Sequence, residues 1–153
     1  MSKIIRIGAV TIILLLVVWI LMRPDSTITS GTAQIVFPKG SVVLVNLADT
    51  NEARTQGLSG HVPLEDEEGL LFLYSTQKRP SYWMKDMLFP IDIIWIRNET
   101  VIGFEQDAQP ENPPITLYVP KEPINRVLEV RSGFVADHQV LIGDELDIRF
   151  SKE

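Results

Sequence analysis

Charged residues interrupt an otherwise apolar stretch of the chain, residues 81–96, which reads SYWMKDMLFPIDIIWI. Within it, Lys85 and Asp92 are groups that can hold or transfer a proton, and Trp83 offers a flat ring on which a ligand can stack. A charge beside an apolar core is costly unless it is paired, solvated or used. The stretch therefore indicates either a ligand site or an ion pair that stabilises the fold.

Strand geometry makes Asp92 the unusual residue of this stretch. A strand alternates its side chains, and the run from Ile91 to Ile96 is apolar enough on both faces to be covered on both sides. A carboxylate there needs a cation, for which Lys85 or Arg54 are the candidates, or several backbone N–H donors. Three interpretations stay open: Asp92 binds loop backbone, the four residues Arg54, Trp83, Lys85 and Asp92 form a ligand site, or Lys85 is a catalytic amine.

Other reactive residue types lack the spacing that their chemistry requires. The sequence GLSG at residues 57–60 does not have the spacing of a nucleophile elbow, so a serine hydrolase is not expected. His61 and His138 are far apart in the sequence without a paired zinc motif, and the acidic residues 65–68 are typical of a solvated loop. The chain has no cysteine, which excludes disulfides and thiolate ligands. We expect no metal ion and no other cofactor.

Short β-branched runs separated by turn residues predict a mainly β domain, a compact sandwich or barrel, with one or two short helices. Asp49 is expected to cap a helix through Gln56, with Glu52 in the capping-box position and Gly57 as its stop. Ser132 is expected to cap a second short helix. The predicted strands are residues 34–37, 41–48, 70–74, 91–96, 101–104, 116–119, 126–130 and 146–150.

Composition is that of a folded protein with a single domain. The chain has 153 residues, of which 45% are hydrophobic and 22% are charged, and this balance argues against disorder. Its net charge of -6 makes a nucleic-acid surface improbable, because such surfaces need clustered positive charge.

The N-terminus is predicted to be a membrane segment. Residues 7–22 contain no charge, and together with residues 4–6 they reach the length that a bilayer requires. A cleaved signal peptide is the alternative, but the small residues 31–33 lie well beyond the apolar run. Two basic residues before the span predict a single-pass protein of the cell membrane whose domain faces the periplasm or cell exterior. Residues 1–23 would then be the cytoplasmic tip and span, 24–33 a flexible tether and 34–153 the domain.

Three motifs carry a family resemblance: EARTQGLSGHVPLEDEEGLLFLY, YWMKDMLFPIDIIWI and VLEVRSGFVADHQVLIGDEL. In this order and spacing they resemble DUF192, a widespread prokaryotic family of unknown function, over residues 34–150. Arg54, Gly57 and Leu58 match the family pattern, whereas Ser59 and His61 stand where methionine and arginine are usual. Asp86 occupies the place of a frequent asparagine. The resemblance implies a compact, mainly β domain behind a signal sequence or anchor, and it implies no activity.

The sequence therefore predicts a binding or accessory module for a cell-envelope ligand, a saccharide or a peptide. Arg54, Trp83, Lys85 and Asp92 are the predicted ligand-binding residues. One alternative is a small enzyme in which Asp92 is a general base and Lys85 or Arg54 stabilises negative charge. A second alternative is a structural interaction domain in which these residues form only a buried network. The predicted partners are the membrane, through residues 4–22, and the envelope ligand, but no nucleic acid.

Overall fold

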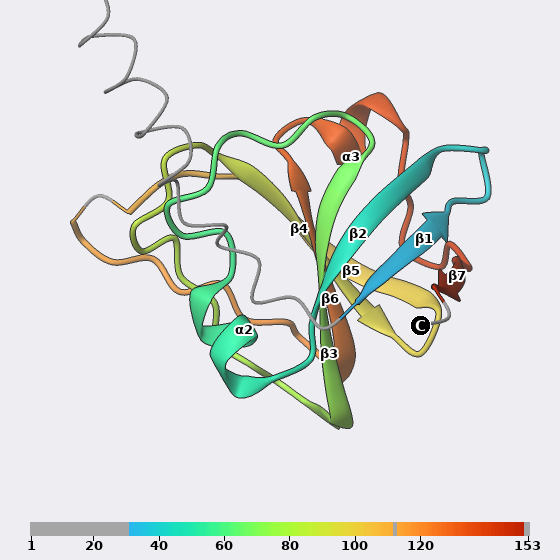
Figure 1. Cartoon of the computed structure of the whole chain (residues 1–153), viewed down its shortest axis with the longest axis horizontal. Helices are drawn as coiled ribbons and strands as arrows, with labels where there is room; N and C mark the ends of the chain where they lie inside the picture. Colours follow the sequence, from blue (N-terminus) through green and yellow to red (C-terminus); the bar gives the residue numbers. More distant parts are fainter. Residues whose placement is uncertain (1–30, 112, 152–153) are drawn as a thin grey trace, which may run out of the picture.

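Seven strands form one sheet in the order β5-β4-β6-β3-β2-β1-β7 (Figure 1). The computed structural model describes residues 31–111 and 113–151, and within them the prediction of a mainly β domain with short helices is confirmed. The strands are β1 (Thr32–Val36), β2 (Val42–Ala48), β3 (Glu68–Lys78), β4 (Ile91–Arg97), β5 (Thr100–Ala108), β6 (Ile124–Arg131) and β7 (Asp147–Phe150). The helices are α2 (Asn51–Gln56) and α3 (Phe134–Asp137).

Chain order and sheet order differ at the centre of the sheet. β1 and β2 form the predicted antiparallel hairpin, and α2 then connects β2 to β3, which pairs with β2 in parallel. The late strand β6 lies between β3 and β4 and is antiparallel to both. β6 is therefore covered by a neighbour on each edge, which makes it one of the most enclosed strands of the sheet.

A short segment links the two edges of the sheet. The Leu146 N–H donates to the Glu99 carbonyl at 2.9 Å, and the Val101 N–H donates to the Asp144 carbonyl at 2.9 Å. This segment leads directly into β7, which pairs with β1 at the far end of the strand order. Because hydrogen bonds join the start of β5 to the chain just before β7, the sheet curls into a barrel-like shape.

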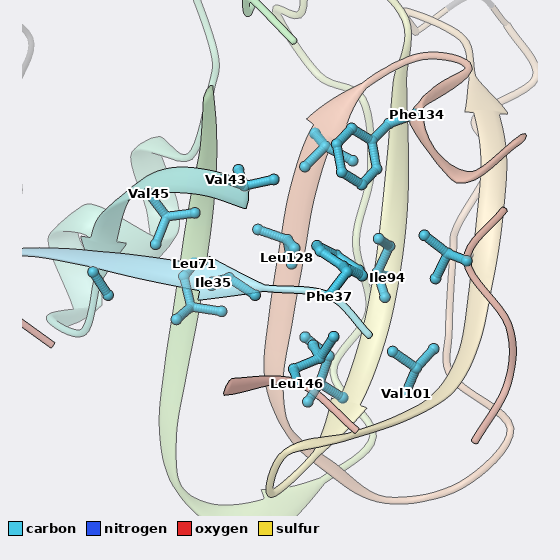
Figure 2. Packing of buried hydrophobic residues seen from close by; sticks show 14 of the residues in the cluster. Ile35, Phe37, Val43, Val45, Leu71, Ile94, Val101, Leu128, Phe134 and Leu146 are labelled. Carbon is cyan, nitrogen blue, oxygen red and sulfur yellow. The ribbon is translucent and has the colours of Figure 1, made fainter. Parts of the chain in front are cut away.

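Apolar residues pack on both faces of the central strands. One cluster, the barrel core, lies between the strands and α3, and it includes Ile35, Leu71, Leu128 and Phe134 (Figure 2). The second cluster, the outer core, covers the other face of β3, β4 and β6 with residues of α2 and of the segment 81–89. Alternation places the next residue along each of these strands in the other cluster, as expected for strands covered on both sides.

The predicted helix caps are wrong at both helices. α2 begins one residue later than expected, so Thr50 is its N-cap and accepts a hydrogen bond from the Ala53 N–H at 3.1 Å. Asp49 then lies outside the helix, and Glu52 is one position short of the capping box. α3 follows Gly133 and has no side-chain cap, because the Ser132 hydroxyl donates instead to the Asp107 carboxylate at 2.7 Å.

Several predicted boundaries also change, and β3, β5 and β6 are all longer than predicted. Residues 116–119 do not form a strand, and only Tyr118 makes a β-bridge, with Tyr82. Prolines on both sides of this segment limit its pairing. β1 begins at Thr32, and Ala33 is buried in the barrel core, so the last two residues of the predicted tether belong to the domain.

No helix in the part of the chain that the structure describes is long and apolar enough to cross a membrane. The predicted span at residues 4–22 lies outside the described residues.

Candidate functional site

A pocket of about 280 Å³ opens on the side of the outer core. Two hydrogen bonds fasten one of its walls, the turn after α2, to the opposite wall, residues 81–87: the Ser59 hydroxyl donates to the Lys85 carbonyl at 2.9 Å, and the Gly60 N–H donates to the Asp86 carbonyl at 3.0 Å. The lining residues come from α2 and its turn, β3, residues 81–87, β4 and β6. They are Arg54, Thr55, Gln56, Gly57, Leu58, Ser59, Phe72, Tyr74, Ser81, Tyr82, Trp83, Met84, Met87, Ile91 and Glu129.

Glu129 reaches the pocket from β6. Val127, two residues earlier, packs in the outer core, so Glu129 points to the same face of the sheet. Its exposed fraction is only 6%, and no described residue makes a hydrogen bond or ion pair with its carboxyl group. In the described part of the chain, every side-chain oxygen that is fully buried has a hydrogen-bond partner. Since the Glu129 oxygens have none, they are not fully buried and must touch the open space of the pocket.

Burial raises the pKa of Glu129 from 4.5 to about 8. At pH 7 the side chain is then mostly a neutral carboxylic acid, which can both donate and accept a hydrogen bond. A buried titratable group that faces a pocket with its pKa moved this far is typical of functional sites. Glu129 is therefore the centre of the candidate site.

Two phenols lie beside this carboxyl group. The Tyr74 and Tyr82 hydroxyl oxygens are 2.6 Å apart and share a hydrogen bond. Burial raises the pKa of both phenols above its ordinary value, and a negative charge on Glu129 raises it further. Both tyrosines therefore stay neutral, and the pocket brings together three groups that carry protons.

Arg54 lines the pocket, but the protein itself uses most of its guanidinium group. One nitrogen donates to the Leu73 carbonyl at 2.9 Å and also to the Asp49 carbonyl, and another donates to the Asn51 side chain at 2.7 Å. The group lies 5.4 Å from the centre of the Tyr74 ring. These contacts tie α2 to β3, so Arg54 fixes the pocket wall, and its predicted contact with a ligand stays a prediction.

Trp83 contributes an available aromatic surface. It lines the pocket and its exposed fraction is 55%, whereas its neighbours Tyr82 and Met84 are buried. The Lys85 ammonium lies 5.7 Å from the centre of the Trp83 ring. The Lys85 side chain is exposed and Lys85 is not a lining residue, so its ammonium group lies beside the site, although its carbonyl helps to fasten the wall.

Asp92 lies on the opposite face of the sheet from the pocket. It is fully buried, and its carboxylate accepts hydrogen bonds from the N–H groups of Asp107 at 2.8 Å, Gly133 at 3.3 Å and Val135 at 2.9 Å. Of the open interpretations of Asp92, these hydrogen bonds match the one in which it binds loop backbone, and its pairing with Lys85 or Arg54 is wrong. Asp92 holds the start of α3 and the end of β5 on the barrel.

The predicted site is thus divided by the sheet, and its central residue was missed. Arg54 and Trp83 meet in one pocket, Lys85 lies beside it, and Asp92 is excluded from it. Glu129 carries the same sequence signal as Asp92, a carboxylate within an apolar run, here RVLEV. That signal could have identified it as a second buried acid, but not as the one without a partner.

A second polar cluster lies away from the pocket. His138 bridges the Ser41 hydroxyl at 2.7 Å and the Asp66 carboxylate at 3.2 Å, and Arg131 also pairs with Asp66 and with Asp137. A hydrogen bond from His138 lowers the pKa of Asp66. These contacts join the β1–β2 turn, the loop before β3 and α3, which gives the cluster a structural role.

Fold and pocket together define a small, mainly β domain whose candidate site centres on a buried carboxyl group. The chain belongs to the DUF192 family, described as "Uncharacterized ACR, COG1430", whose model matches residues 34–148. The predicted family is confirmed. A comparison with curated proteins gave no match.

Similar solved structures include two from bacteria. A protein of unknown function from Novosphingobium aromaticivorans DSM 12444 has a TM-score of 0.72 and 27% identity, covering 82% of this chain and 89% of that one. A Sinorhizobium meliloti 1021 protein with a provisional description as a transcription regulator has a TM-score of 0.68 and 26% identity, covering 76% of this chain and 92% of that one. Neither similarity brings an activity to this pocket.

Proposed function

We propose that the chain is a membrane-tethered, extracytoplasmic binding module, and that its pocket holds a small polar ligand of the cell envelope, a saccharide or a peptide. The observation that carries the proposal is Glu129, a buried carboxyl group that faces the pocket without a described partner. A buried polar group without a hydrogen bond is destabilising, so a ligand that supplies the partner would gain binding energy there.

The rim of the pocket supports the same function. An exposed tryptophan that borders a pocket gives a ligand a large rigid contact area, and the Tyr74 and Tyr82 hydroxyls provide polar contacts beside it. Residues 4–22, apolar apart from Arg6, form a segment long enough to span a bilayer that would keep the domain near the envelope.

A ligand screen tests this proposal. We would measure the thermal midpoint of the full chain, in mild detergent, against sugars, envelope fragments and peptides, in parallel with Trp83→Ala and Leu88→Ala. Leu88 is the matched control, because it is 71% exposed in the same segment but does not line the pocket. A ligand that stabilises wild type and Leu88→Ala, and binds Trp83→Ala at least about tenfold more weakly, supports the proposal. Equal binding by both variants would exclude this pocket.

A small enzyme is the second candidate function, and Glu129 rather than Asp92 favours it. The hydrogen bonds of Asp92 to three backbone N–H groups leave it unsuited to accept a substrate proton. A carboxyl group with a pKa of about 8 that reaches a pocket has the property of a general acid near neutral pH. Chemical turnover of a screened ligand, lost in Glu129→Gln, would separate an enzyme from a binding module.

A further inference from the structure

We infer that the ligand of this pocket is an uncharged saccharide, and that it accepts a hydrogen bond from the Glu129 carboxylic acid. The inference rests on the proposed function and narrows it to one class of ligand.

The neighbours of Glu129 favour its neutral form. Its cross-strand neighbours are Leu70 on β3 and Ile93 on β4, both buried and apolar. The groups with protons or charge that face it across the pocket are the hydroxyls of Tyr74 and Tyr82 and the guanidinium of Arg54. No described residue is paired with the carboxyl group, so a charge on Glu129 would be buried without a partner.

The same surroundings disfavour a charged ligand. To pair with a cation, Glu129 would have to lose its proton inside the protein. The cation would also be repelled by the positive charge of Arg54 in the same pocket. An anion would find most of the Arg54 donors already used, by Leu73, Asp49 and Asn51. A neutral ligand with hydrogen-bond acceptors avoids both penalties and supplies the partner that the carboxylic acid lacks.

The aromatic rim and the small volume of the site suit a sugar ring. Trp83 presents an exposed ring at the rim, against which the apolar face of a sugar can stack. The hydroxyl groups of the sugar can then form hydrogen bonds with Glu129 and with Tyr74 and Tyr82. A volume of about 280 Å³ is just below the usual range for pockets that enclose a drug-sized ligand, which suits one ring of a longer saccharide.

A pH series with matched probes tests the inference. The neutral probes are triacetylchitotriose, cellotriose and maltotriose, and the charged control is the deacetylated chitotriose, which carries ammonium groups at pH 6. Binding to the full chain would be measured by calorimetry from pH 6 to pH 9.5. We expect one neutral trisaccharide to bind at pH 6, the cationic trimer to bind at least tenfold more weakly, and affinity to fall about tenfold per pH unit above pH 8, where Glu129 loses its proton.

Two variants separate recognition by Glu129 from a general effect of pH. Glu129→Gln keeps the size of the side chain and cannot ionise, so its affinity should be independent of pH over this range. Glu129→Ala should bind at least tenfold more weakly at pH 6. Circular dichroism and the thermal midpoint of each variant establish that it is folded.

The outcomes distinguish this inference from the proposed function. Saccharide binding that is independent of pH in wild type would overturn the role of Glu129 and leave the binding module intact. Tighter binding of the cationic trimer, or binding of a peptide through Trp83 when no saccharide binds, would overturn the ligand class alone. If neither the trisaccharides nor the wider screen gives a ligand that depends on Trp83, both proposals fail.

Discussion

At the scale of single residues, Glu129 should make the stability of the protein depend on pH. Its pKa is raised from 4.5 to about 8 on folding, so the folded state holds the proton more tightly than the unfolded chain. The resulting stabilisation is complete below pH 4.5 and is lost as pH rises through 8, by at most about 1.4 kcal/mol per pH unit. Glu129→Gln removes this dependence.

Urea unfolding of the full chain at pH 5, 6, 7 and 8 measures the effect. Relative to Glu129→Gln, the wild type should lose stability steadily over this range, by roughly 3 kcal/mol in total. Glu67→Gln, an exchange at an exposed glutamate, is the control and should follow the wild type. Parallel curves for wild type and Glu129→Gln would mean that the carboxyl group is already ionised in the folded protein.

Asp92 is the second residue whose removal has a defined consequence. In Asp92→Asn the side-chain amide replaces one acceptor oxygen with a donor, which then faces N–H groups that also donate. We expect a loss of about 2 to 4 kcal/mol in the free energy of unfolding, because hydrogen bonds to a charged group are lost and a buried N–H group is left without an acceptor. Asp86→Asn should change it little, because Asp86 is exposed and asparagine tolerates its positive φ of 56°. An equally mild effect of Asp92→Asn would contradict this structural role.

The sequence predicted which strand residues face each side of the sheet, but not which groups contact each buried carboxyl group. Asp92 and Glu129 both interrupt apolar runs, and this pattern indicates a buried carboxylate in either case. Asp92 receives its donors from Asp107, Gly133 and Val135, all at least fifteen positions away, while the neighbours of Glu129 provide none. The difference between a structural acid and a candidate functional one therefore arises from tertiary contacts.

At the scale of elements, α2 depends on its cap because its 6 residues make fewer than two turns. The Thr50 hydroxyl satisfies the Ala53 N–H, and Thr50→Ala should lower the free energy of unfolding by about 1 kcal/mol. Thr55→Ala is the control in the same helix, since the Thr55 hydroxyl donates to the Asn51 carbonyl and caps nothing. Its effect should stay below about 0.5 kcal/mol. Denaturant unfolding of both variants checks the difference, and equal effects would contradict the capping role of Thr50.

Strand positions were easier to predict than helix starts for a physical reason. A strand repeats its apolar signal at every second residue, whereas a cap depends on one side chain and on which residue first becomes helical. Thr50 and Asp49 are both good capping residues, so the sequence alone could not choose between them. β6 was predicted as a strand, but its place between β3 and β4 follows from pairing across the whole chain.

At the scale of the whole molecule, closure of the sheet by the segment before β7 should control how the barrel opens. Leu146 is 4% exposed in the barrel core, and its N–H donates to the carbonyl of Glu99, the residue just before β5. Leu146→Ala removes that packing and should cost about 2 to 5 kcal/mol. Ile142→Ala, in the same segment but at a side chain that is 68% exposed, should cost less than about 0.5 kcal/mol.

Hydrogen exchange distinguishes opening of this closure from general loss of stability. If the segment holds the two sheet edges together, Leu146→Ala should speed amide exchange at Val101 and Leu146 more than at Leu128, in the middle of β6. The pocket lies on the other side of the central strands, so Ser59 and Gly60, whose contacts fasten its walls, should keep their wild-type protection relative to Leu128. A uniform increase at all these amides would mean that the closure opens only when the entire domain unfolds.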